Sequence, residues 1–182
     1  MSEQSRGVLY LIACASPRAR RIAELVGLLQ ADGWDVCVIS TPQARKFIDT
    51  DALAAQTGHP VRHDYKHPDE PDVLPAADAM AVCPATFNTL NKWALGISDT
   101  LALGLLTEAI GLGLPLVAAP ALNSAQAGHP AFDQSLAVLR AAGVNVLYGP
   151  GVYEPSPPGS GGGDYPWDLV IDALKDRTYS TG

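Results

Sequence analysis

Four runs of strand length in this sequence consist almost entirely of apolar residues. They are VLYLIA at 8–13, VCVI at 36–39, MAVC at 80–83 and LPLVAAP at 114–120. A strand that is apolar at every position is buried on both faces, as in a parallel sheet covered by helices. Between the first two runs, Ile22, Leu25 and Leu29 recur at helical spacing. The pattern predicts an α/β fold with a parallel sheet and helices on both faces.

Weaker patterns predict the remaining elements. We expect a short strand at 60–62 and a last strand at 144–149. A long helical stretch covers 88–112, with a break at Gly96. Residues 149–167 are rich in Pro, Gly and Ser, which cannot form a core, so we expect a flexible surface loop. A loop of this length often acts as a lid over a binding site.

Composition limits the class of protein and its partners. The 182 residues are 47% hydrophobic and 17% charged, which is typical of a single globular domain covering 1–182. The net charge of -7 argues against a nucleic-acid partner. No apolar run is long enough for a membrane span, so we expect a cytoplasmic protein. The three widely spaced cysteines argue against a disulfide framework and a metal site, and they fit a reducing compartment.

Polar residues gather where four predicted strands end. These exits are ACAS at 13–16, STPQ at 40–43, PATFNT at 84–89 and PALNSAQ at 120–126. Ligands of open α/β sheets bind beyond the carboxyl ends of the strands, and helix N-termini attract phosphate. Ser16, Ser40 and Thr41 are therefore candidates for a phosphate pocket, although Ser16 and Thr41 are alternatively helix caps or turn residues. Because no GxGxxG or Walker lysine motif is present, a mononucleotide fits better than a dinucleotide or a triphosphate.

Several of these segments occur in the order of a known family. PATFNT is similar to the PASANT motif, and APALN to the PxMN motif, of the flavin-dependent cysteine decarboxylase superfamily. That superfamily includes phosphopantothenoylcysteine decarboxylase and the peptidyl-cysteine decarboxylases of lantibiotic biosynthesis. Further segments that resemble the family, in the right order, are VISTPQARKFI, GISDTLALGLL, GHPAF and the clamp segment SGGGDY. The resemblance covers nearly the whole chain.

The resemblance implies a three-layer Rossmann-like (flavodoxin-like) flavoprotein that binds FMN and assembles as a homotrimer or a higher trimer-based oligomer. It also implies the oxidative decarboxylation of a cysteine-like or peptidyl thiol acid, with Asn123 holding the substrate carboxylate. The cofactor contacts that it implies are Ser16 and Thr41 at the FMN phosphate, Thr86 and Asn88 beside phosphate, ribityl chain or ring, Phe47 near the flavin, and Asp99 behind PATFNT.

The position of the family's histidine is not matched directly. Counting back from Pro84 at the family spacing reaches Glu70 instead. A short insertion would bring His67 into that place. Because the unperturbed pKa of an imidazole is about 6.5, His67 is a candidate catalytic base. The alternative is that His63 and His67 are solvated loop residues.

Two further departures affect the substrate. The family's PxMNxxMW reads PALNSAQA here, so that Leu122, Gln126 and Ala127 replace Met, Met and Trp. These replacements change the wall of the expected substrate pocket. Gly162 stands where reducing phosphopantothenoylcysteine decarboxylases carry a cysteine. A glycine in place of that cysteine favours a reaction that leaves reduced flavin for reoxidation.

Three functions stay open at this point. Asn123 and the glycine-rich clamp favour an enzyme. The missing histidine and the altered PxMNxxMW favour an FMN-binding oligomer with a lapsed active site, in a regulatory or scaffolding role. The third is a nucleotide-binding Rossmann domain without flavin.

Overall fold

Five parallel strands form the centre of the fold, in the order β2-β1-β3-β4-β5. Their bounds are β1 Gly7–Ala13, β2 Trp34–Ser40, β3 Ala79–Ala85, β4 Leu116–Pro120 and β5 Asn145–Val146. The computed structural model describes residues 5–160 and 165–175. This strand order is that of flavodoxin-like folds, whose ligands bind where the order reverses beside β1.

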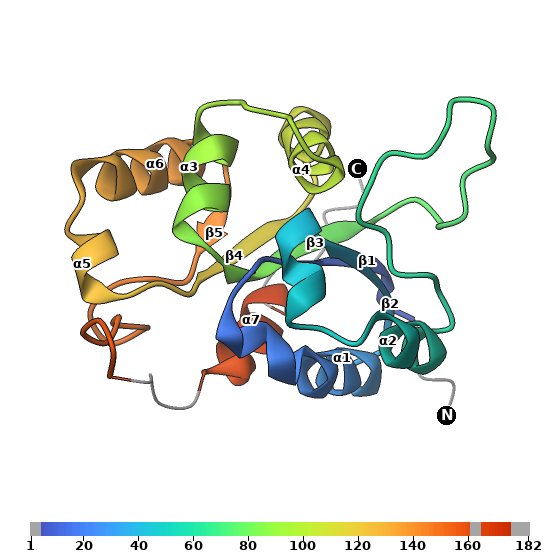
Figure 1. The fold of residues 1–182 in the computed structure, drawn as a ribbon, viewed down its shortest axis with the longest axis horizontal. Coiled ribbons are helices and arrows are strands. Elements are labelled where there is room, and N and C mark those ends of the chain that lie inside the picture. The colour runs from blue at the N-terminus through green and yellow to red at the C-terminus, as the bar shows by residue number, and fades with distance from the viewer. Residues whose placement is uncertain (1–4, 161–164, 176–182) are drawn as a thin grey trace.

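Helices cover both faces of the sheet, which confirms the predicted three-layer α/β arrangement (Figure 1). One face carries α1 (Ile22–Ala31), α2 (Thr50–Thr57) and α7 (Trp167–Lys175), and the other carries α3 (Phe87–Ala94), α4 (Leu101–Leu112) and α6 (Pro130–Ala141). Three short helices follow strands: η1 (Pro17–Arg21) after β1, η2 (Pro42–Lys46) after β2 and α5 (Ser124–Ala127) after β4. Across the residues that the structure describes, no helix is long and apolar enough to cross a bilayer.

Successive residues of β1 point to opposite faces of the sheet. Leu9 and Leu11 pack with α1 and α7, whereas Tyr10 and Ile12 pack with α3 and α4. All four side chains are at most 8% exposed. Burial of each such side chain contributes about 1.5–3 kcal/mol to stability. Since both faces are filled by core residues, polar side chains from the strands find room at the strand ends.

Two predicted strands differ from the structure, and one predicted helix break is confirmed. The strand expected at 60–62 is wrong: only Arg62 pairs, in one bridge with Ile39, and the proline at position 60 has no N–H to donate to a ladder. The last strand is shorter than expected and ends at Val146. The predicted break in the 88–112 helix is confirmed, because Gly96 has a φ of 71°, a left-handed value that glycine adopts without strain.

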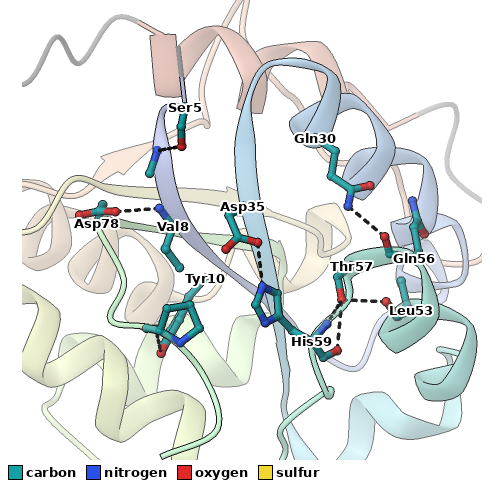
Figure 2. Close-up of polar contacts among 12 residues, drawn as sticks. Ser5, Val8, Tyr10, Gln30, Asp35, Leu53, Gln56, Thr57, His59 and Asp78 are labelled. Carbon is teal, nitrogen blue, oxygen red and sulfur yellow. Dashed lines mark hydrogen bonds and ion pairs between the residues drawn. The ribbon is translucent and has the colours of Figure 1, made fainter. Parts of the chain in front are cut away.

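Local polar contacts stabilise the amino ends of the strands, at the edge of the sheet away from the predicted site (Figure 2). The Val8 N–H donates to Asp78 Oδ2 over 2.7 Å, which ties the start of β1 to the segment before β3. On β2, Asp35 Oδ1 lies 2.7 Å from His59 Nε2. These side chains are occupied by partners within the fold, so this edge has a structural role.

Candidate cofactor and substrate site

A cavity of about 710 Å³ lies at the carboxyl edge of the sheet. All four predicted strand exits contribute to its wall, through residues 15–18, 41–43, 86–89 and 121–123. The Pro/Gly-rich loop adds Ser156, Pro157, Gly159 and Ser160. The volume falls within the ~300–1,000 Å³ of ordinary cofactor and ligand pockets. The structure therefore assembles one cavity from segments far apart in the sequence.

Two predicted phosphate contacts from the first exits lie on the cavity wall. Ser16 is the N-cap of η1, and its Oγ accepts the Arg18 N–H over 3.3 Å. Thr41 is the N-cap of η2, but its side chain makes no capping hydrogen bond. Capping and ligand binding are thus compatible at Ser16, and the Thr41 hydroxyl is not needed to cap its own helix.

The third exit aims the first turn of α3 at the cavity. Thr86 caps this helix: its Oγ1 accepts the Thr89 N–H over 3.4 Å and donates to Thr89 Oγ1 over 3.2 Å. The helix begins at Phe87, one residue before the predicted start, and Asn88 follows in the same turn. Free backbone N–H groups at a helix start carry partial positive charge, so this turn favours an anion.

Four predicted site residues lie outside the cavity wall, and two of them are held in place by the fold. Ser40 is fully buried, and its Oγ has no hydrogen-bond partner within residues 5–160 and 165–175. Phe47 is half-buried at the end of η2, with the Arg20 guanidinium carbon 5.9 Å from its ring centre. A contact of either residue with flavin stays a prediction.

Asp99 also lies outside the wall, but it contacts a residue that belongs to it. Its carboxylate is 2.6 Å from Lys92 Nζ, across the turn between α3 and α4. Lys92 and Arg18 are the charged side chains among the described residues of the cavity wall, and both are cations. A chain with a net charge of -7 thus presents a cationic cavity, which suits an anionic ligand.

His67 lies in the loop 58–78 and not on the cavity wall. Its side chain is 68% exposed, and its Nδ1 accepts the Asp69 N–H over 3.4 Å. The loop is attached to α4 by Tyr65, whose hydroxyl donates to the Thr100 carbonyl over 3.3 Å. Gly104 makes room for this contact, because a Cβ there would collide with the Tyr65 hydroxyl. The role of His67 as a base stays a prediction.

The fourth exit places Asn123 on the wall and holds it by a reciprocal pair of hydrogen bonds with Gln126. Asn123 Oδ1 accepts the Gln126 N–H over 2.9 Å, and Gln126 Oε1 accepts the Asn123 N–H over 3.4 Å. This is a capping box, which fixes both side chains at the start of α5. Neither the helix nor the role of Gln126 follows from the family motif, although the N-x-x-Q spacing is a recognisable sequence pattern for such a cap.

The C-terminal segment supplies an anchor that sequence reasoning missed. The Tyr165 hydroxyl donates to the carbonyls of Ala119 and Pro120, at the end of β4. Its ring packs against Tyr153 at a centroid distance of 5.6 Å, and the Arg18 guanidinium carbon lies 4.9 Å above it. Tyr153 and Tyr165 therefore bring the two ends of the Pro/Gly-rich loop together beside the cavity. Most of the predicted SGGGDY clamp, residues 161–164 with the glycine at 162, lies outside the described residues.

The fold and the cavity define a flavodoxin-like protein whose cavity lies at the strand ends. The sequence model of the Flavoprotein family matches residues 1–178, so the chain belongs to this family, as its motifs predict. A solved structure of the FMN-dependent cysteine decarboxylase SpaF is similar in fold, with a TM-score of 0.74 and 26% identity, covering 94% of this chain and 97% of SpaF. These matches confirm the predicted resemblance and the predicted fold class.

The matches to two relatives cover different shares of those proteins' own lengths. Phosphopantothenoylcysteine decarboxylase of Mus musculus is 32% identical over 156 residues, which cover 78% of this chain and 72% of the mouse protein. The coenzyme A biosynthesis bifunctional protein of Thermococcus kodakarensis is 32% identical over 144 residues, covering 75% of this chain. The match spans only 36% of that bifunctional protein.

The three cysteines are free, and all of them are buried in the core. Burial raises the pKa of Cys14, despite hydrogen bonds to Thr89 and Thr86 that act in the opposite direction. Burial likewise raises the pKa of Cys37 to about 12 and that of Cys83 still further above its ordinary value. Raised values leave the neutral thiol, which is a poor nucleophile. Within residues 5–160 and 165–175, no group of three or more His, Cys, Asp or Glu side chains is placed to hold a metal ion.

We expect the native protein to react slowly with a thiol reagent such as Ellman's reagent at about pH 8. Because burial raises the pKa of each thiol and shields it from the reagent, the rate should be at least ~100-fold lower than in denaturant. The measurement is the absorbance of the released thiolate with and without guanidinium. Rapid labelling of a native thiol would show that one of the cysteines is activated.

Proposed function

We propose that this chain is an FMN-dependent oxidative decarboxylase that acts on a cysteine-like or peptidyl thiol acid. The observation that carries the proposal is the single cavity in which hydroxyl and amide side chains from all four strand exits meet. When bound, FMN would supply the two-electron oxidation of the thiol-bearing carbon that allows the neighbouring carbon to lose carbon dioxide. The family membership and the likeness to SpaF support this reading.

The residues of the wall fit both the phosphate and the ring system of FMN. Ser16, Thr41 and the first turn of α3 provide hydroxyl and N–H donors for a phosphate. Leu103 and Leu122 provide apolar surface for a ring system. Cofactor pockets combine apolar walls with a few placed polar groups in this way.

Asn123 is the residue that we propose holds the substrate carboxylate. Its Oδ1 is engaged by the Gln126 N–H, so its amide NH₂ is the part available to a ligand. The loop residues Ser156 and Pro157 lie on the same wall, and the Ser124 N–H donates to the Ser156 carbonyl over 2.9 Å. The loop would exclude water from the acid group, which strengthens its hydrogen bonds.

A second candidate function is an FMN-binding oligomer without catalysis, and one observation favours it. Among the described residues of the cavity wall there is no His, Asp or Glu that would move a proton. The decarboxylase therefore needs a base from elsewhere, either from the 58–78 loop of a second copy, where His67 lies, or from residues outside the described ranges. Turnover by the purified protein decides between the two candidates.

We also propose that the chain forms a homotrimer or a trimer-based oligomer in the cytoplasm, where its free thiols would stay reduced. Leu95 is 75% exposed and Ile97 is 39% exposed. Both lie in the turn between Lys92 and Thr100, which line the cavity. A second copy seated on this apolar turn would therefore lie next to the cavity.

Replacing Leu95 by Lys should weaken that assembly, because a charge would be buried in an apolar contact. Light scattering during size-exclusion chromatography measures the mass of the assembly. We expect a trimer or a multiple of it for the unchanged chain and a smaller species for L95K. Leu28→Lys is the control, since Leu28 is 42% exposed on α1, on the opposite face of the sheet. A monomeric unchanged chain would contradict the proposal.

Replacing Thr41 by Val should lower FMN affinity by about tenfold, because a hydroxyl that donates to phosphate is lost without change of shape. Thr50→Val, at the start of α2 and outside the cavity wall, should leave the affinity unchanged. Quenching of flavin fluorescence on titration gives both values. Protein that is colourless after FMN has been added and the unbound FMN removed would contradict the proposed cofactor.

Replacing Asn123 by Asp should lower kcat/KM for a cysteine-ended peptide by about 100-fold or more, with FMN content unchanged. Asp is as good an N-cap as Asn, so α5 should persist while the amide donor is replaced by a repelling charge. Mass spectrometry of the peptide follows the loss of the carboxyl group. Undiminished turnover by this variant would show that Asn123 does not hold the substrate.

A further inference from the structure

The capping box at the start of α5 leaves two amide groups with a defined orientation. A backbone N–H can only donate, so the side-chain atoms that face the N–H groups of Asn123 and Gln126 are the amide oxygens. Both oxygens are used inside the box. The Nδ2 group of Asn123 and the Nε2 group of Gln126 are therefore the parts of these side chains that remain for a ligand.

Both side chains lie on the cavity wall, and three of the backbone donors beside them are already used. The Ser124 N–H donates to the Ser156 carbonyl over 2.9 Å, and the N–H groups of Asn123 and Gln126 lie in the box. The side-chain donors of this stretch on the cavity wall are thus a pair of amides three residues apart on one turn. The pair suits a ligand group with two neighbouring acceptor oxygens.

We propose that Gln126 is a second substrate-binding donor, which holds one oxygen of the substrate carboxylate while Asn123 holds the other. The substrate class is therefore an acid with a free carboxylate at the thiol-bearing end, and not the corresponding amide or ester. This inference rests on the proposed decarboxylase function. It depends on this chain's own residue, since the family motif has Met at this position, whose thioether donates no hydrogen bond.

Two neutral donors suit a carboxylate that is about to leave as carbon dioxide. A full positive charge would stabilise the ground-state carboxylate more than the transition state, in which the negative charge moves away from the acid group. The two cations of the wall have other contacts: Lys92 pairs with Asp99 over 2.6 Å, and Arg18 stacks on Tyr165. The amide pair would orient the acid group without holding its charge in place.

The test compares the binding of the peptide Ala-Ala-Cys and of its C-terminal amide to protein whose bound FMN has first been reduced with dithionite, measured by calorimetry without oxygen. The unchanged protein should bind the acid at least about tenfold more tightly than the amide. Gln126→Glu should abolish that preference. Glu retains the capping box, where it is a favoured residue, but it replaces the donor by a carboxylate. Gln134→Glu, on the exposed side of α6, makes the same change of charge away from the cavity and should keep the preference.

Equal binding of acid and amide by the unchanged protein, including no binding of either, would overturn the inference. An undiminished preference in Q126E would overturn it as well. Because reduced FMN cannot oxidise the peptide, calorimetry then reads the binding preference alone. Failure to bind FMN or to oxidise the peptide would therefore count separately, against the proposed function.

Discussion

The burial of the sheet on both faces is the constraint on which the rest of the structure depends. Strands such as β1 carry core residues on each side, packed against α1 and α7 on one face and α3 and α4 on the other. Polar groups then collect where the strands end, and parallel strands end at one edge. The cavity is assembled there from four segments that are far apart in the sequence but leave the sheet together.

Much of this could be predicted from the sequence, because unbroken apolar runs permit few architectures. The strand ends that carry polar residues could also be located from the sequence. Four of these residues do lie on one cavity wall: Ser16, Thr41, Thr86 and Asn123. The prediction of a strand at 60–62 was wrong because this segment, which begins with a proline, makes only a single bridge. Strand pairing depends on tertiary contacts that the local sequence pattern does not encode.

Contacts between distant segments explain what the sequence did not reveal about the site. The anchoring of Tyr165 on the end of β4 joins residues 46 positions apart. The link between Lys92 and Asp99 depends on the turn that separates α3 from α4. Gln126 departs from the family motif, and its hydrogen bonds with Asn123 give that departure a physical meaning. The described residues of the cavity wall do not supply the group that transfers the proton. The oligomeric state therefore bears on the mechanism, because a second copy is one source of that group.

A single turnover without oxygen distinguishes a decarboxylase from an FMN-binding protein without catalysis. FMN-loaded protein is mixed with a cysteine-ended peptide, while flavin absorbance and peptide mass are followed together. If the chain is an oxidative decarboxylase, the flavin bleaches as each peptide loses two hydrogens and one carbon dioxide, and one flavin is reduced for each peptide converted. Flavin that stays oxidised, with every peptide of a broad panel unchanged in mass, would contradict it and favour an FMN-binding protein without catalysis.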